Sequence, residues 1–233
     1  MPMPKLGDVV SYLEMCADEG VNLQRGMNFR LRDDRSLILM SLRKGAPYAD
    51  RVEDGGSVLI YEGHDVARIQ GGPDPKKVDQ PEFYPSGRPT QNGLFCEAVR
   101  RFKRSESPPE RVKVFEKIHA GIWVYNGLFI LTDAWQEESN GRKVFKFKLE
   151  LVEDRLGLKV QDAPATEHDR LIPSSVKLEV WKRDKGKCVI CGSKTNLHFD
   201  HDIPYSQGGS SKEAKNIQIL CAKHNLAKRD RII

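Results

Sequence analysis

The sequence predicts an α+β protein with a large, strand-rich N-terminal part and a small C-terminal part. Six segments before residue 152 have the apolar, β-branched and aromatic composition of strands. A polar stretch with two prolines follows at residues 158–173. Behind it, three cysteines and one histidine occur as two pairs, with two residues between the members of each pair. We therefore expect two domains, at residues 1–157 and 173–233, joined by a linker at 158–172.

The expected strands of the N-terminal part lie at residues 36–41, 57–61, 111–115, 122–125, 128–135 and 143–151. In the last of these, aromatic and leucine residues from Phe145 onwards alternate with a set that includes Lys146 and Lys148. This alternation is typical of a strand with one buried and one exposed face. Residues 71–93 are rich in proline and glycine and should form a loop, and residues 92–104 should form a short helix.

In the C-terminal part, a helix is expected to follow Pro173 and to run to about residue 183. Ser174 or Ser175 would be its N-cap. The first cysteine pair comes next, followed by a strand at 198–203 and a loop at 205–209. Residues 216–231 should be mostly helical.

Charge differs between the two parts. Residues 170–233 contain 13 basic and 6 acidic residues, whereas the other 169 residues contain 25 and 27. A basic module beside a near-neutral one is typical of proteins whose small module binds nucleic acid. No apolar run reaches the length of a membrane span, and the N-terminus has no secretory signal, so we expect a cytoplasmic protein without membrane contact.

The two ligand pairs are Cys188 with Cys191 and Cys221 with His224. Two intervening residues let one tight turn point both side chains at one ion, so this spacing is typical of a tetrahedral zinc site. A module this small buries little core, and a structural zinc ion is the expected source of its stability. With five cysteines, three of them in these pairs, a reducing compartment is more plausible than a disulfide framework.

The C-terminal motifs resemble those of zinc-stabilised HNH endonucleases. The chain has Cys-Val-Ile-Cys, then Asp-His, Gly-Gly and a lone Asn, then Cys-Ala-Lys-His-Asn, in the order and spacing of that family. The resemblance covers about residues 173–231. It implies a ββα-metal fold that hydrolyses DNA.

The resemblance also implies a role for each polar residue. Asp200 and Asn225 would hold a hard cation, Mg²⁺ or Mn²⁺, which prefers oxygen ligands. His201 would accept a proton from the attacking water, as suits a side chain that titrates near neutrality. Asn216 would orient either the loop or the imidazole. Lys228, Arg229 and Arg231 follow the motif, and we expect them to hold the DNA backbone electrostatically.

The sequence departs from the HNH pattern in two places. His224 stands where a cysteine is commoner, and Asn225 stands at a histidine position. One alternative is therefore that His224 serves the catalytic cation and the zinc site is incomplete. Another is a zinc ribbon without catalysis. His198 lies on the same strand face as Asp200, and we expect it to be a solvated strand residue.

Two segments of the N-terminal part resemble SRA domains, the modules that recognise 5-methylcytosine. The first runs over residues 45–63, and the second is Tyr-Asn-Gly at 125–127. The resemblance covers about residues 7–153 and implies a PUA-like, twisted β-barrel.

An SRA domain flips the modified base out of the duplex, and such a base is held between aromatic faces and hydrogen-bonded on its pairing edge. By this resemblance Tyr48 and Tyr61 are the expected faces, and Asp50 is the expected acceptor for the exocyclic amine of cytosine. Glu53 and Asp54 remain alternatives to Asp50.

Both resemblances together predict a modification-dependent restriction endonuclease of the SRA–HNH type. It would act on double-stranded DNA that carries 5-methylcytosine or its hydroxymethyl form. One HNH site cuts one strand, so a double-strand break requires a homodimer or sequential nicks. One alternative is an HNH nicking or homing-type nuclease that recognises base sequence and not modification. The other is a non-catalytic protein that binds methylated DNA and uses zinc only to stabilise its fold.

Overall fold

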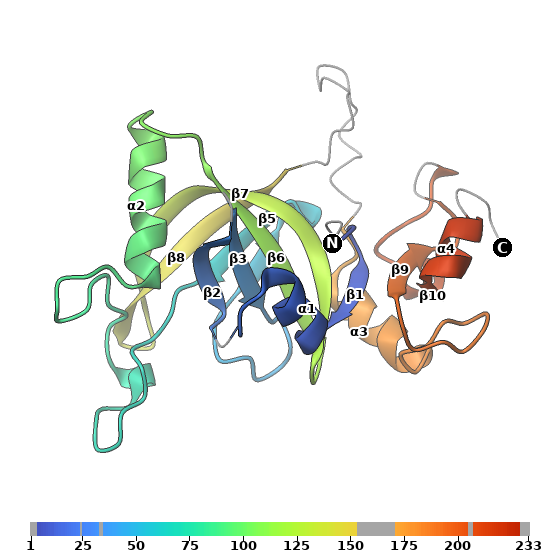
Figure 1. Ribbon diagram of the computed structural model, residues 1–233, viewed down its shortest axis with the longest axis horizontal. Coiled ribbons are helices and arrows are strands. Elements are labelled where there is room, and N and C mark those ends of the chain that lie inside the picture. Colours follow the sequence, from blue (N-terminus) through green and yellow to red (C-terminus); the bar gives the residue numbers. More distant parts are fainter. Residues whose placement is uncertain (1–3, 24, 33–34, 153–170, 205–206, 229–233) are drawn as a thin grey trace.

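The computed structural model describes residues 4–23, 25–32, 35–152, 171–204 and 207–228. The expected α+β class is confirmed. A strongly curved sheet with one long helix forms the N-terminal part, and a small module of two strands and two helices forms the C-terminal part (Figure 1). Residues 158–170 of the expected linker lie outside the described residues, so the domain boundaries stay predictions.

The elements of the N-terminal part are β1 (Asp8–Ser11), α1 (Tyr12–Glu19), β2 (Met27–Arg32), β3 (Arg35–Met40), β4 (Arg51–Glu53), η1 (Asp54–Gly56), β5 (Val58–Glu62), η2 (Pro75–Lys77), α2 (Gln91–Lys103), β6 (Glu110–His119), β7 (Ile122–Ser139) and β8 (Arg142–Leu151). Those of the C-terminal part are α3 (Ser174–Arg183), β9 (Leu197–His201), η5 (Ala214–Asn216), β10 (Ile217–Cys221) and α4 (Ala222–Lys228).

The long strand β7 organises the N-terminal sheet. Its first half pairs with β6 and its second half with β8, both antiparallel. Beyond β6 lie β3, paired in parallel, and then β2; beyond β8 lie β5 and β4. The two sets of strands, β6-β3-β2 and β8-β5-β4, share β7 and curve around one apolar core. The helix α2 packs against this core through Phe95 and Val99. The sequence indicated the strands of this core but not β1, β2 or β4.

A β-bulge stands in β7 where the sequence suggested a gap between two strands. Val114 of β6 faces Gly127, and Phe115 faces Tyr125, so Asn126 is the extra residue without a partner opposite it. Gly127 has a φ of 107°, which favours glycine. A bulge bends its strand and changes the direction of the extra side chain. The two strands expected at 122–125 and 128–135 are therefore parts of one strand, β7, with a bulge between them.

The alternation in β8 does not produce an exposed face along its whole length. Lys146 is only 1% exposed, and its ammonium lies 2.9 Å from the Glu62 carboxylate of β5. Arg142 is also buried and lies 2.6 Å from Asp65. The expected polar face is thus partly a buried network of paired charges, as buried charges require.

Two local expectations for the C-terminal part are wrong. The N-cap of α3 is Pro173, and Ser174 and Ser175 lie inside the helix. Residues 217–221 form the strand β10 and not a helix, because they pair with β9 from Ile217 through Cys221.

The short strand β1 connects the two parts of the molecule. It pairs antiparallel with β7 on one side and with β9 on the other. The strand order β10-β9-β1-β7 therefore carries the N-terminal sheet into the C-terminal module (Figure 1). In the part of the chain that the structure describes, no helix is long and apolar enough to cross a membrane.

Candidate functional site

The four predicted zinc ligands meet at one point. Cys188 and Cys191 belong to the turn after α3, Cys221 ends β10, and His224 lies in the first turn of α4. Their ligand atoms all lie within 4.8 Å of one another. The separations are 3.8 Å between the sulfurs of Cys191 and Cys221, and 3.4 Å and 3.3 Å from the His224 Nδ1 to the sulfurs of Cys188 and Cys221.

These separations fit a zinc ion. A tetrahedral ion with Zn–S bonds of about 2.3 Å places two sulfurs roughly 3.8 Å apart. Burial raises the pKa of the Cys188 thiol, but hydrogen bonds from backbone amides and from His224 outweigh burial and bring it to about 6. The thiolate form of Cys188, the form that binds zinc, is thus favoured. His224 lies in this cluster, which argues against its serving a second cation.

Asp200 and His201 lie at the end of β9. The Asp200 carboxylate Oδ2 accepts a hydrogen bond of 2.8 Å from the Lys228 ammonium, which also donates to the backbone carbonyl of His201. Lys228 is only 2% exposed. The expectation that Lys228 holds the DNA backbone is therefore wrong, and its charge instead holds the end of β9.

The imidazole of His201 has a hydroxyl partner that the sequence did not indicate. Its Nε2 lies 2.8 Å from the Oγ of the buried Ser211. Burial lowers the pKa of His201, the Asp200 carboxylate raises it and the Lys228 ammonium lowers it, and the net shift is downward. The imidazole is therefore neutral at neutral pH, the form that can accept a proton.

Asn216 holds a loop and not the imidazole. Its amide accepts a hydrogen bond of 2.8 Å from the Ile203 amide and donates to the carbonyls of Ile203 and Ser210 at 3.2 and 3.0 Å. Of the two roles left open by the sequence, the structure shows the first. This brace brings Ser211 close to His201.

Asn225 lies three residues before Lys228 on α4 and is half-buried. Side chains three apart share a helix face, so Asn225 faces the side on which Lys228 meets Asp200. The oxygen donors of Asp200 and Asn225 are of the type that Mg²⁺ and Mn²⁺ prefer.

His198 is not a solvated strand residue, contrary to expectation. Its Nδ1 bonds to the carboxylate of Asp8 in β1. This contact joins the C-terminal module to the N-terminal sheet at the point where β1 and β9 pair.

In the N-terminal part, Tyr48 lies beside His64, a residue that the sequence analysis did not single out. Their rings are stacked, with centroids 6.0 Å apart and planes at 23°. The Lys76 ammonium lies 3.9 Å from the centroid of the Tyr48 ring and 2.8 Å from Asp65. Burial lowers the pKa of His64 to about 4, helped by the charge of Arg25. The Tyr48 ring is thus in contact with a cation and with a second aromatic ring.

Asp50 is engaged by the backbone. Its two carboxylate oxygens accept hydrogen bonds from the amides of Glu62 at 3.0 Å and of Ser41 at 3.4 Å. Burial raises its pKa to about 6, although both hydrogen bonds lower it. Of the alternatives, Glu53 is exposed and pairs with Arg51 at 2.7 Å, and Asp54 is exposed in the turn η1.

Tyr61 is 1% exposed and belongs to the apolar core. Its hydroxyl lies 3.5 Å from the Nε2 of His64. The ring therefore cannot stack on a base unless neighbouring side chains move, whereas His64 lies nearer the surface.

Comparison with known proteins gives a family match in the C-terminal part of the chain. Residues 188–231 match the family model of the HNH endonuclease. The C-terminal part of the chain therefore contains an HNH domain. No curated protein matches the chain.

Among solved structures, the SRA domain of SUVH5 with fully methylated CG DNA is similar at 23% identity and a TM-score of 0.47, covering 68% of this chain and 96% of that chain. SUVH5 SRA bound to fully hydroxymethylated CG DNA is similar at 23% identity and a TM-score of 0.47, covering 68% and 95%. The modification-dependent TagI restriction endonuclease is similar at 20% identity and a TM-score of 0.42, covering 97% of this chain and 77% of that chain.

Proposed function

We propose that the protein is a modification-dependent DNA endonuclease. Its N-terminal part, residues 1–157, would bind a flipped 5-methylcytosine or 5-hydroxymethylcytosine, and its C-terminal domain, residues 173–233, would hydrolyse a phosphodiester bond. The observation that carries the proposal is the separation of two polar sets in the HNH domain. A zinc ribbon without catalysis needs only the Cys3His cluster. It does not account for the hydrogen bond from Lys228 to Asp200 or for the one between Ser211 and His201.

Each set has its own metal in this proposal. Cys188, Cys191, Cys221 and His224 hold a structural zinc ion. Asp200 and Asn225 would hold Mg²⁺ or Mn²⁺, which when bound stabilises the negative charge that develops on the phosphate and the leaving oxygen.

The residues of the chain supply the proton transfer. With Ser211 accepting from the Nε2–H of His201, the basic lone pair of the imidazole is on Nδ1 and can take the proton of the attacking water. Lys228 fixes the orientation of the Asp200 carboxylate, and Asn216 fixes the loop that carries Ser211. The catalytic residues in this account are His201, Asp200 and Asn225, and Asn216 and Ser211 are positioning residues.

For the modified base, we propose Tyr48 as one aromatic face, with His64 beside it. A neutral imidazole can both donate and accept a hydrogen bond, and burial keeps His64 neutral. Asp50 is the proposed acceptor for the cytosine amine, because each carboxylate oxygen has two lone pairs and the backbone uses one on each. Tyr61 would contact the base only after a local rearrangement.

A cleavage assay tests the proposal directly. One plasmid is prepared unmodified, cytosine-methylated and hydroxymethylated, and each form is incubated with the protein and Mg²⁺ or Mn²⁺. We expect cleavage of the modified forms only, and none with His201→Ala. Zinc content of His201→Ala should equal that of the wild type, since His201 is not part of the zinc cluster.

Other outcomes distinguish the alternatives. Equal cleavage of all plasmid forms would mean that the N-terminal part does not recognise the modification, as in a nicking nuclease that recognises base sequence. Selective binding of methylated DNA without cleavage under either cation would identify a reader with a structural zinc ion. Loss of zinc from His201→Ala would overturn the role given to His201.

A further inference from the structure

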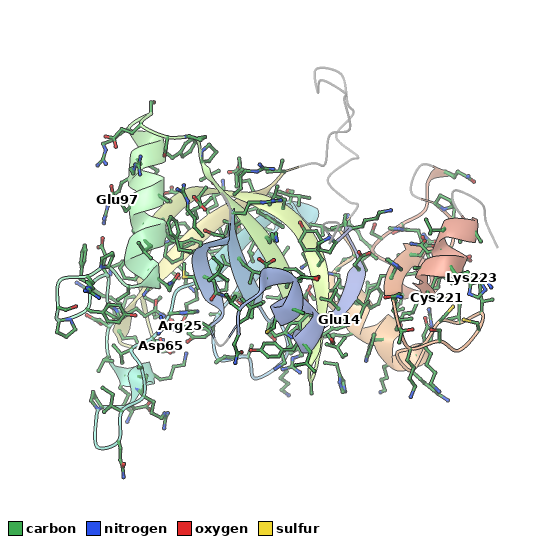
Figure 2. All side chains as sticks on the ribbon, in the orientation of Figure 1. Glu14, Arg25, Asp65, Glu97, Cys221 and Lys223 are labelled. Carbon is green, nitrogen blue, oxygen red and sulfur yellow. The ribbon has the colours of Figure 1, made fainter. Side chains whose placement is uncertain are left out.

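Tyr48 of the proposed base site and the zinc cluster lie far apart in the molecule, whereas Asp50 lines a cavity beside α3. Asp65, which pairs with Lys76 beside Tyr48, and Cys221 of the zinc cluster lie toward opposite ends of the long axis (Figure 2). Whatever holds the two parts together therefore determines where a cut can fall relative to the modified base. Three features of the junction bear on this.

The first feature is the shared sheet. Val9 of β1 is paired with Val124 of β7 on one side and with Leu197 of β9 on the other. The contact between His198 and Asp8 adds a side-chain bond at the same place. Apolar residues of both parts form one core there, with Ile118 and Val124 packed among residues of α3, β9 and β10.

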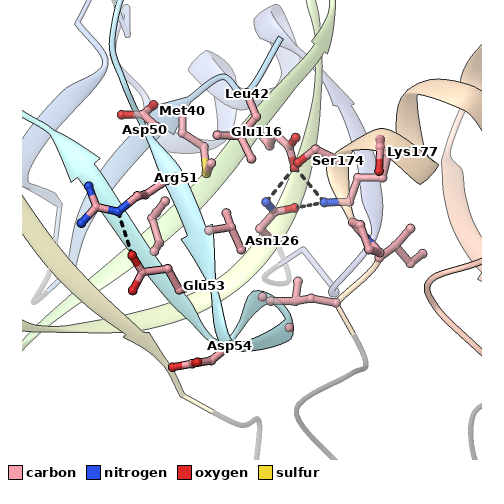
Figure 3. Close-up of a pocket in the computed structure, with 18 of the residues that line it drawn as sticks. Met40, Leu42, Asp50, Arg51, Glu53, Asp54, Glu116, Asn126, Ser174 and Lys177 are labelled. Atoms are coloured by element: carbon pink, nitrogen blue, oxygen red, sulfur yellow. Dashed lines mark hydrogen bonds and ion pairs between the residues drawn. The ribbon is translucent and has the colours of Figure 1, made fainter.

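The second feature is a buried polar group that we call the junction cluster: Glu116 of β6, Asn126 of β7 and Lys177 of α3. The Lys177 ammonium lies 2.8 Å from the Glu116 carboxylate and 2.7 Å from the Asn126 carbonyl oxygen, and the Asn126 amide donates to Glu116 at 3.0 Å. Glu116, Asn126 and Lys177 are 2%, 7% and 3% exposed. Their side chains point toward one another (Figure 3). Asn126 is the bulge residue of β7, so the bulge presents the amide that completes the cluster.

The third feature is incomplete apolar packing next to the junction cluster. A cavity of about 560 Å³ lies between the N-terminal sheet and the start of α3, with Leu59 and Phe129 on one side and Ile172 and Ser174 on the other. The junction cluster therefore lies beside a space that apolar side chains do not fill.

A buried ion pair adds little net stability, because desolvation of both charges offsets their attraction. Its effect is on geometry, since any displaced arrangement that leaves one of the two charges buried without its partner is strongly disfavoured. Burial would raise the pKa of Glu116, but Lys177 and the neighbouring hydrogen bonds outweigh it and lower the pKa. The Glu116 carboxylate is therefore charged, and the observed orientation of α3 brings the Lys177 ammonium to it.

We propose that Lys177, through Glu116 and Asn126, is a positioning residue that fixes the HNH domain relative to the base site, so that cleavage occurs at one set distance from the modified cytosine. This inference rests on the proposed function. The distance is determined by the junction and not by the length of the chain between residues 153 and 170.

Insertion into that segment separates the two possibilities. About ten added residues extend the reach of a tether by at most roughly 33–36 Å, the length of about ten base pairs. On a duplex with one methylated cytosine, we expect the insertion variant to cut at the same positions as the wild type. A cut pattern that spreads or shifts with the insertion, or that is already spread in the wild type, would overturn the proposal.

Substitution at the junction gives the opposite expectation. Lys177→Met should spread the cut positions over several base pairs. Because this change leaves Glu116 charged and buried, the double variant Glu116→Gln with Lys177→Met serves as a second test that removes both charges. Lys182→Met, on the exposed side of α3, should keep the wild-type pattern. A narrow, unshifted pattern in the double variant would overturn the role of the cluster.

A DNA-free measurement separates failure of this inference from failure of the proposed function. The insertion is designed to carry a site for a specific protease, and the cleaved protein is examined by size-exclusion chromatography. We expect both fragments to elute together. If they separate, the fixed junction is refuted whatever the DNA specificity; if they stay together and methylated DNA is not preferred, only the proposed function fails.

Discussion

Ser211 orients the proposed general base. Its Oγ lies 2.8 Å from the Nε2 of His201, and it is buried in a loop braced by Asn216. A neutral hydrogen bond is worth about 1 kcal/mol, so we expect Ser211→Ala to lower kcat roughly five- to tenfold. KM for DNA should stay unchanged, because the hydroxyl acts on the imidazole and not on the substrate.

Single-turnover cleavage of a modified duplex measures this effect. Ser211→Thr, which keeps the hydroxyl, should recover most of the rate, and Ser210→Ala is the matched control in the same loop. A Ser211→Ala protein that cleaves at the wild-type rate would show that the imidazole needs no such partner.

Tyr48 is the proposed aromatic face at the base site. Stacking of a base on an aromatic ring contributes about 1–3 kcal/mol. Tyr48→Ala should therefore reduce the preference for methylated over unmodified duplex by roughly 5- to 150-fold, measured as the ratio of the two Kd values. Tyr48→Phe keeps the ring and should keep the ratio. Equal ratios in the wild type and Tyr48→Ala would exclude this face.

Residue-level prediction from the sequence found the groups with distinctive spacing and missed their partners. The cysteines, Asp200 and His201 stand in motifs whose spacing reflects a requirement of metal binding or catalysis. Ser211 and Lys228 act through contacts across a loop and between elements, 10 and 28 residues from their partners. A serine or lysine at such a separation has no pattern in the sequence that marks it.

At the scale of elements, β9, β10 and α4 depend on the zinc cluster. The ligands lie in the turn after α3, at the end of β10 and in the first turn of α4, so a bound ion would tie these elements together. Cys221→Ser should reduce the zinc content from about one ion per chain to near none and abolish cleavage.

Zinc content and hydrogen exchange of the amides of β9 and β10 test this expectation. His224→Ala should behave like Cys221→Ser, because its Nδ1 lies 3.4 Å from the Cys188 sulfur. Cys16→Ser, far from the cluster in sequence and in α1, should keep its zinc. Full zinc content in His224→Ala would revive the assignment of His224 to the second cation.

Element prediction succeeded where the local pattern and the final burial agree. The strands around residues 36–41 and 143–151 and the helix after residue 91 have periodic apolar residues that pack in the core. It failed where tertiary contacts decide the state. Residues 217–221 are a strand because β9 pairs with them, and β1 is a strand because two other strands flank it.

For the whole molecule, the shared sheet and the junction cluster make one unit with a single HNH site. Such a site hydrolyses one strand at a time, so a double-strand break requires two copies of the chain or two successive events. We propose that the protein acts as a homodimer on double-stranded DNA. The proposed fixed junction also favours a homodimer. An HNH domain that keeps one position on the N-terminal sheet cannot move across the duplex to reach the second strand.

Plasmid cleavage followed over time at several protein concentrations tests the dimer. Linear product should appear without accumulation of nicked circles above the dimer dissociation constant, and nicked circles should accumulate below it. Sedimentation of the protein on a short modified duplex should show two chains per duplex under the first condition. A protein that sediments as a monomer on DNA and still breaks both strands in one event would contradict the homodimer, because one fixed site cannot face both strands at once.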